Sequence, residues 1–85
     1  MDRRALLRRL AQGHLRNVGF RDLVSLVEGF GFQEARVRGN HHIFRHPGVA
    51  ELLNLQEVGG QAKPYQIRQV LRLVERYGLR LEEQG

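Results

Sequence analysis

The chain has 85 residues, no cysteine and a net charge of +5, with 14 Lys and Arg against nine Asp and Glu. This length predicts one domain with a single core, over residues 1–85. The missing cysteines exclude disulfides, a thiolate nucleophile and sulfur-ligated zinc, and no apolar run approaches the length of a membrane span. We therefore expect a cytoplasmic protein.

Two helices are predicted in the first third of the chain. Leu6, Leu7 and Leu10 recur at helical spacing within residues 2–12, which indicates a short amphipathic helix. A second apolar stripe predicts a helix from about residue 20 to residue 29, where glycines end it.

Three strands are predicted next. Residues 32–38 alternate, with Glu34, Arg36 and Arg38 on one face. Residues 39–40 are Gly-Asn, which suits a tight hairpin turn, so residues 41–46 form the return strand. A Pro-Gly pair ends that strand, and residues 51–55 supply the third.

The last helix begins at Pro64, where a missing N–H is harmless, and Gly78 ends it. The order of elements is therefore α-α-β-β-β-α. Such an order is typical of an α+β fold, with helices packed on one face of an antiparallel three-stranded sheet.

The charge pattern indicates a polyanionic partner. Thirteen of the 14 cations are arginine, which favours planar, bidentate contacts with phosphate or carboxylate groups. Nucleic acid is the natural candidate, and an acidic protein is the second. A basic surface without any ligand is the third possibility.

Three of the four histidines lie within residues 41–46, but their spacing argues against a metal site. On a strand, His41 and His42 point to opposite faces, and His42 and His46 lie about 13 Å apart. No carboxylate has ligand spacing. We expect no metal and no cofactor.

Nucleophilic catalysis by the chain itself is also poorly supported, since its one serine, Ser25, lies within the second predicted helix. RNA carries its own nucleophile in the 2′-hydroxyl group, so a cleaving site needs only a proton carrier and cations. Strand alternation groups His41 with Arg45. It does not decide which face of this strand is buried, and His42 and His46 fit surface or cross-strand positions without chemistry. Lys63, just before the last helix, is a second possible phosphate contact.

Two segments together resemble the HicA toxin family. Residues 39–47, Gly-Asn-His-His-Ile-Phe-Arg-His-Pro, are similar to its G-S-H-x-x-aromatic motif, and residues 63–71, which begin Lys-Pro-Tyr, are similar to its closing segment. The resemblance covers residues 18–79 as a family core and leaves residues 1–17 as a helical extension. Asn40 departs from the family pattern, which has serine at that position.

The resemblance implies a fold similar to double-stranded-RNA-binding domains and a toxin that cuts messenger RNA without a metal. By motif position it implies that His41 is the active-site residue and that a HicB antitoxin neutralises the protein. On this hypothesis Arg38, Arg45, Lys63 and Arg68 are candidates for holding the RNA backbone. His42 occupies a variable motif position and inherits no role.

Two other functions remain open from the sequence. One is a non-catalytic RNA-binding module of the same fold, which would bind RNA in a salt-dependent way without cutting it. The other is a protein-interaction domain whose basic face meets an acidic partner. The extension at residues 1–17 fits either packing against the domain or binding a partner.

Overall fold

The computed structural model describes residues 2–82. These residues form, in order, α1 (Arg3–Ala11), α2 (Phe20–Gly29), β1 (Gln33–Arg38), β2 (His41–His46), β3 (Val49–Gln56) and α3 (Pro64–Tyr77). The strands pair antiparallel in the order β1-β2-β3, so β2 is central. The predicted α+β fold with a three-stranded antiparallel sheet is confirmed.

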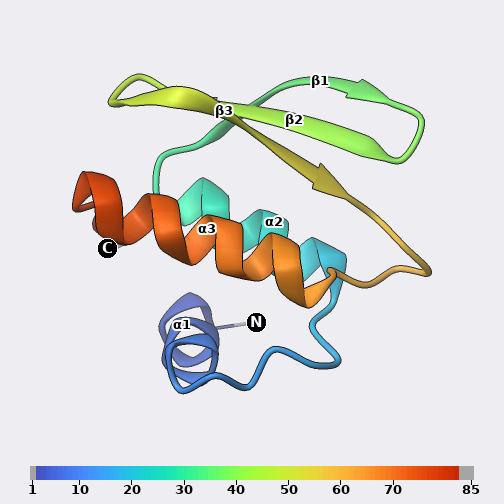
Figure 1. The fold of residues 1–85 in the computed structure, drawn as a ribbon, viewed down its shortest axis with the longest axis vertical. Helices are drawn as coiled ribbons and strands as arrows, with labels where there is room; N and C mark the ends of the chain where they lie inside the picture. The colour runs from blue at the N-terminus through green and yellow to red at the C-terminus, as the bar shows by residue number, and fades with distance from the viewer. Residues whose placement is uncertain (1, 83–85) are drawn as a thin grey trace.

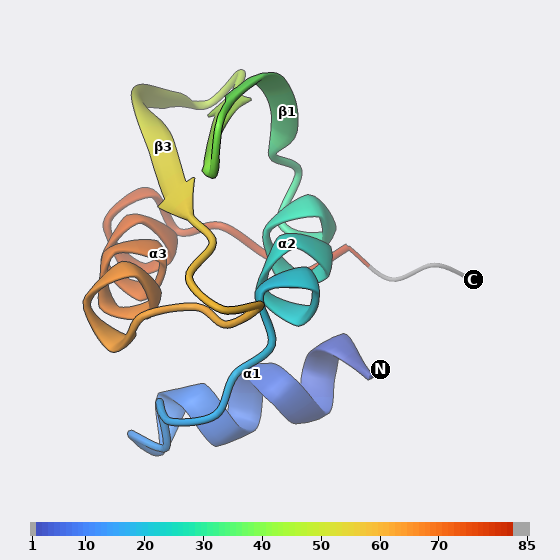
Figure 2. The same cartoon turned by 90° about the vertical axis from the view of Figure 1, so that its right-hand side faces the viewer.

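The elements lie in three layers (Figures 1 and 2). The sheet forms one outer layer, α2 and α3 cover one of its faces side by side, and α1 lies on the far side of these two helices. The other face of the sheet is left open. Within residues 2–82, no helix is both long and apolar enough to cross a membrane.

Phe44 determines which face of β2 is buried, a choice that the sequence left open. Its side chain is fully buried under the sheet, whereas Arg45 is exposed and Ile43 is only half-buried. Because side chains alternate along a strand, this burial directs His42 and His46 toward the helices. His41, Ile43 and Arg45 consequently lie on the open face.

A two-residue turn joins β1 to β2, as the Gly-Asn pair predicted. Gly39 has φ +57°, a left-handed conformation that glycine adopts without strain, and Arg38 pairs directly with His41 across the turn. The turn therefore places an arginine beside the histidine of the predicted active site.

The expected side-chain alternation of β1 is wrong at Glu34, because the strand contains a bulge. Glu34 pairs with Phe44 but Arg36 pairs with Ile43, so Ala35 is an extra residue. The bulge rotates Glu34 to the helix-facing side, while Arg36 and Arg38 stay on the open face. The three charged residues do not share one face.

The helical extension packs against the domain. Leu6 and Leu10 of α1 belong to the same buried cluster as Leu23, Leu26 and Val27 of α2. Asp2 caps α1 by accepting a hydrogen bond from the backbone N–H of Arg4 at 2.9 Å. Of the two uses that the sequence left open, packing is the one observed.

The burial of α1 predicts a large loss of stability for Leu10→Ala. Leu10 is 1% exposed, and truncation of a buried leucine costs about 2–5 kcal/mol. We expect urea unfolding of Leu10→Ala to show a loss in this range. The control is Leu7→Ala on the same helix, whose side chain is only partly buried. Equal, small losses for both variants would contradict the placement of α1 in the core.

Candidate functional site

His41 lies exposed at the start of the central strand, next to the β1–β2 turn. Its Nδ1 lies 3.2 Å from Oδ1 of Asn54 on β3. An amide oxygen only accepts hydrogen bonds, so in the neutral imidazole this contact places the proton on Nδ1 and the lone pair on the other ring nitrogen, Nε2. Within residues 2–82 no group is bonded to Nε2. The arrangement leaves a proton acceptor facing solvent.

Asn40 fixes the hairpin turn that carries His41. Its side-chain amide donates a hydrogen bond to the carbonyl oxygen of Glu57 at 3.0 Å, and the Glu57 N–H donates to the Asn40 carbonyl at 2.9 Å. This pair of bonds ties the turn to the end of β3. Asparagine at this position of the motif therefore supports the local geometry.

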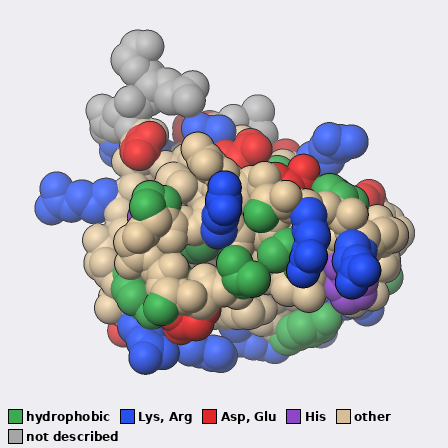
Figure 3. All heavy atoms as spheres, turned by 90° about the horizontal axis from the view of Figure 1, so that it is seen from above, with side chains coloured by type: hydrophobic (Ala, Val, Ile, Leu, Met, Phe, Trp, Pro, Cys, Tyr) green, Lys and Arg blue, Asp and Glu red, His purple; other side chains and the backbone are tan. Residues whose placement is uncertain are grey.

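Arginines accumulate on the open face of the sheet around His41. Arg38 is the direct cross-strand partner of His41, Arg36 is paired with Ile43, and Arg45 lies four residues further along β2, about 13 Å from His41. Figure 3 looks onto this face: Lys and Arg side chains stand across it, acidic groups lie toward its margins, and a histidine lies beside a cation at one end. The surface suits a negatively charged, extended ligand.

The other two predicted RNA-contacting residues lie elsewhere. Lys63 stands at the N-cap position of α3 and lines a separate hollow with residues of the α1–α2 connection, including Arg16 and Asn17. Arg68 is exposed on α3 and lines neither that hollow nor the one at His41. The structure thus groups Arg38 and Arg45 with His41, and leaves Lys63 and Arg68 outside this group.

A hollow of about 200 Å³ adjoins His41 where β3 meets the first turns of α3. Its remaining lining residues are Asn54, Gln56, Tyr65, Gln66 and Gln69. None of these side chains is charged, although the adjacent open face carries three arginines. The site therefore has two chemically different parts, a cationic face and a neutral polar hollow.

The other two histidines of β2 have structural contacts. His46 accepts a hydrogen bond from the Gly48 N–H on Nδ1 and bonds the Phe30 carbonyl through Nε2, at 2.9 and 3.0 Å. His42 lies 2.9 Å from a carboxylate oxygen of Glu34 and 4.8 Å, between ring centroids, from Phe20. Among the described residues, no three His, Cys, Asp or Glu side chains gather so as to hold a metal ion.

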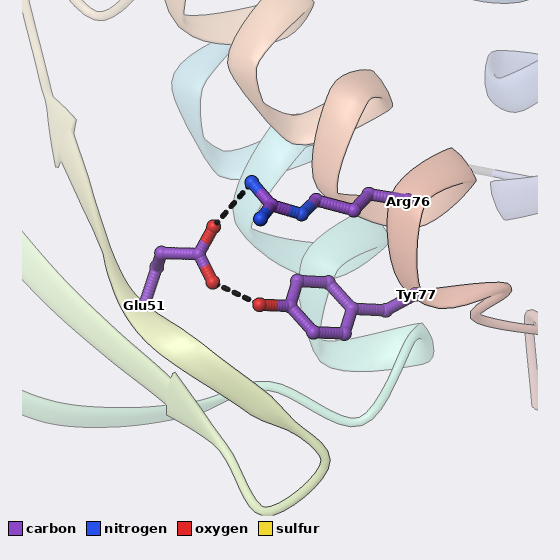
Figure 4. Close-up of polar contacts among 3 residues, drawn as sticks. All are labelled: Glu51, Arg76 and Tyr77. Atoms are coloured by element: carbon purple, nitrogen blue, oxygen red, sulfur yellow. Dashed lines mark hydrogen bonds and ion pairs between the residues drawn. The ribbon is translucent and has the colours of Figure 1, made fainter.

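A polar contact joins α3 to β3 at the end of α3 away from the hollow (Figure 4). The Tyr77 hydroxyl donates a hydrogen bond to Glu51, and Arg76 lies 3.4 Å from the other oxygen of the same carboxylate. The hydrogen bond from Tyr77 lowers the pKa of Glu51 below its ordinary value and raises the pKa of Tyr77.

The lining residues from β3 and α3 were missed by reasoning from the sequence. Asn54 carried a signal, because it is a polar residue between leucines at a position that alternation assigns to the open face. Gln66 and Gln69 carried none, since glutamine is ordinary in a helix and only the packing of α3 against β3 brings them to His41.

Comparison with protein-family models identifies a family that matches more than half of the chain. The model described as the HicA toxin of bacterial toxin–antitoxin matches residues 20–75, which run from the start of α2 to near the end of α3. Searches of curated proteins and of solved structures gave no match. The matched segment includes His41, the arginine-bearing strands and the hollow.

The contact between Tyr77 and Glu51 predicts a pH-dependent difference between the parent and Tyr77→Phe. Because the pKa of Glu51 is lowered, the contact stabilises the fold at pH values above the ordinary carboxyl pKa of 4.5. This stability is lost as the pH falls through the lowered pKa. Because the pKa of Tyr77 is raised, the contact also stabilises the fold at pH values below the ordinary tyrosine pKa of 10.0. This stability is lost as the pH rises through the raised pKa. Denaturant unfolding should therefore show a less stable variant near neutral pH and a narrowing difference at both extremes. A difference that is constant with pH, or that matches the control Tyr65→Phe, would contradict this.

Proposed function

The chain belongs to the HicA toxin family of bacterial toxin–antitoxin systems, and from this premise we propose that it is an endoribonuclease that cuts messenger RNA with one histidine. The toxin assignment implies an antitoxin partner. The observation that supports the proposal best is the exposed His41, whose Nε2 has no partner among residues 2–82 and which has Arg38 directly across the strand pair.

His41 would act on the 2′-hydroxyl group next to the cleaved phosphodiester. Its Nε2 takes the hydroxyl proton as the 2′-oxygen bonds to phosphorus, and the bond from phosphorus to the 5′-oxygen breaks. The imidazolium then returns the proton to that departing oxygen. The products are a 2′,3′-cyclic phosphate and a 5′-hydroxyl end. Asn54 is a positioning residue, since it accepts from Nδ1 and so keeps Nε2 available.

The arginines of the open face would hold the RNA backbone. Arg38 is best placed to stabilise the charge that develops on the phosphate, because it is the cross-strand partner of His41. Arg36 and Arg45 lie further along the same face, both on the side of His41 away from the turn, and suit successive phosphates on one side of the cleaved bond. The proposal thereby adds Arg36 to the predicted contacts and gives Lys63 and Arg68 no part in the cleavage step.

The antitoxin would act by covering the same surface. A toxin that cuts with one imidazole on its open face is neutralised by any partner that buries this imidazole and occupies the arginines beside it. We propose a HicB-like protein in this role, in competition with RNA. A small open reading frame encoding such a protein next to this gene would support the proposal.

His41→Ala should abolish cleavage, because no other imidazole on the open face can replace it. We expect labelled RNA to remain intact with this variant in the presence of a chelator, and expression of the variant to leave cell growth unaffected. Loss of general acid–base catalysis alone costs about 10²–10⁴ in rate. His14→Ala, at an exposed position outside the sheet, is the matched control and should cut RNA like the parent.

Cleavage by His41→Ala at the parent rate would refute the role of this residue. If the parent itself binds RNA but leaves it intact after long incubation, the protein is a non-catalytic RNA-binding module instead. Circular dichroism of both variants establishes that a lost activity is not a lost fold.

Replacing Arg38 or Arg45 by Gln should weaken RNA binding and reduce its salt dependence. Each lost phosphate contact lowers the slope of log affinity against log salt by about 0.7 for a single strand. Arg8→Gln is the control, since Arg8 is exposed on α1, on the opposite side of the molecule from the open face. Equal slopes for all three variants would contradict RNA binding at the open face.

A further inference from the structure

The hollow beside His41 has a chemistry that the cleavage step does not use. Its five lining residues besides His41 are one asparagine, three glutamines and one tyrosine. Phosphate groups favour cations, which lie on the adjoining open face and not in this hollow. A ligand for the hollow should therefore be uncharged, with hydrogen-bonding edges.

Tyr65 gives the hollow an aromatic surface. The residue lies in the first turn of α3 and is 56% exposed. An exposed ring that borders a polar hollow can stack on a planar ligand. Bases of single-stranded nucleic acids stack on aromatic side chains in this way.

Gln66 supplies an unused hydrogen-bonding group. The residue is 2% exposed, and its Oε1 is buried without a partner among the described residues. Its Nε2 donates only a long bond, 3.3 Å, to the Tyr65 hydroxyl. Exchanging the two ends of the amide would leave a buried donor unpaired instead, so one end lacks a partner in either orientation. A ligand that turns this amide toward itself would satisfy it.

We propose that this hollow is a subsite for one nucleobase of a single-stranded RNA, next to the cleaved bond. The base stacks on Tyr65, and the amides of Asn54, Gln66 and Gln69 are the groups available to its hydrogen-bonding edge. This inference rests on the proposed function for the identity of the strand. It adds the requirement that the substrate be unpaired at this position, because a base inside a duplex cannot reach the hollow.

The test measures binding without cleavage. The first probe is a short, fluorescently labelled RNA that is 2′-O-methylated throughout, which removes the nucleophile. The other probes form a series of the same RNA in which one base at a time is deleted. Fluorescence anisotropy gives the affinity of the parent, Tyr65→Ala, Tyr65→Phe and Gln69→Ala. Gln12→Ala, at the exposed position that follows α1, is the matched control for Gln69→Ala.

We expect Tyr65→Ala to weaken binding of the intact probe between about 5-fold and about 150-fold, the range of one stacked base. Tyr65→Phe keeps the ring and should stay close to the parent, as should Gln12→Ala. Deletion of the base at one position of the series should weaken binding by the parent. The probe that lacks this base should bind Tyr65→Ala as tightly as it binds the parent.

Two results would overturn the subsite. One is equal binding of the intact probe by the parent and Tyr65→Ala; the other is a fully duplexed probe that binds the parent as well as the single strand does. Neither result depends on catalysis. If the parent shows the expected base dependence but never cuts unmodified RNA, the ribonuclease proposal is refuted and the subsite stands. If Tyr65→Ala cuts unmodified RNA as fast as the parent, the subsite is refuted and the ribonuclease proposal stands.

Discussion

The burial of Phe44 is the constraint on which the rest of the site depends. Its ring lies between the sheet and the two helices and is fully enclosed. A strand has only two faces, so this burial sends His41, Ile43 and Arg45 outward together, and a shift of one residue would reverse them all. The burial of Phe44 in the hydrophobic core therefore keeps the imidazole of His41 and the guanidinium group of Arg45 exposed to water, although neither side chain is stabilised by packing there.

The sequence predicted most of the fold, because the helical spacing of apolar residues, the alternation along the strands, and the glycines and prolines at the ends of the elements all favoured the same elements. It could not choose the buried face of β2, since Ile43 and Phe44 are both large and apolar and only packing distinguishes them. It could not foresee the extra residue at Ala35, which no turn signal marks. Family resemblance, more than pattern, singled out His41. Asn54 joins it only because β3 pairs with β2 in one register.

The three histidines of one strand illustrate how surroundings assign roles to identical side chains. His46 is held at both ring nitrogens by backbone groups, and its edge blocks any side chain at Gly31, where an added Cβ would lie 2.9 Å from Nε2. His42 is occupied by a carboxylate and a phenyl ring. His41 is the one of the three that lies on the open face of the sheet, and among the described residues its Nε2 has no hydrogen-bond partner. The role proposed for His41 therefore follows from its position on the cationic open face of the sheet, which His42 and His46 do not share.

The bulge in β1 has a consequence for how such a surface changes over evolutionary time. With regular pairing, Glu34 would stand opposite Arg45 and offset a positive charge in the middle of the open face. One added residue turns that carboxylate to the reverse side, where it meets His42. Insertion or loss of a single codon in this strand can thus alter the electrostatic potential of the sheet while every charged amino acid is retained.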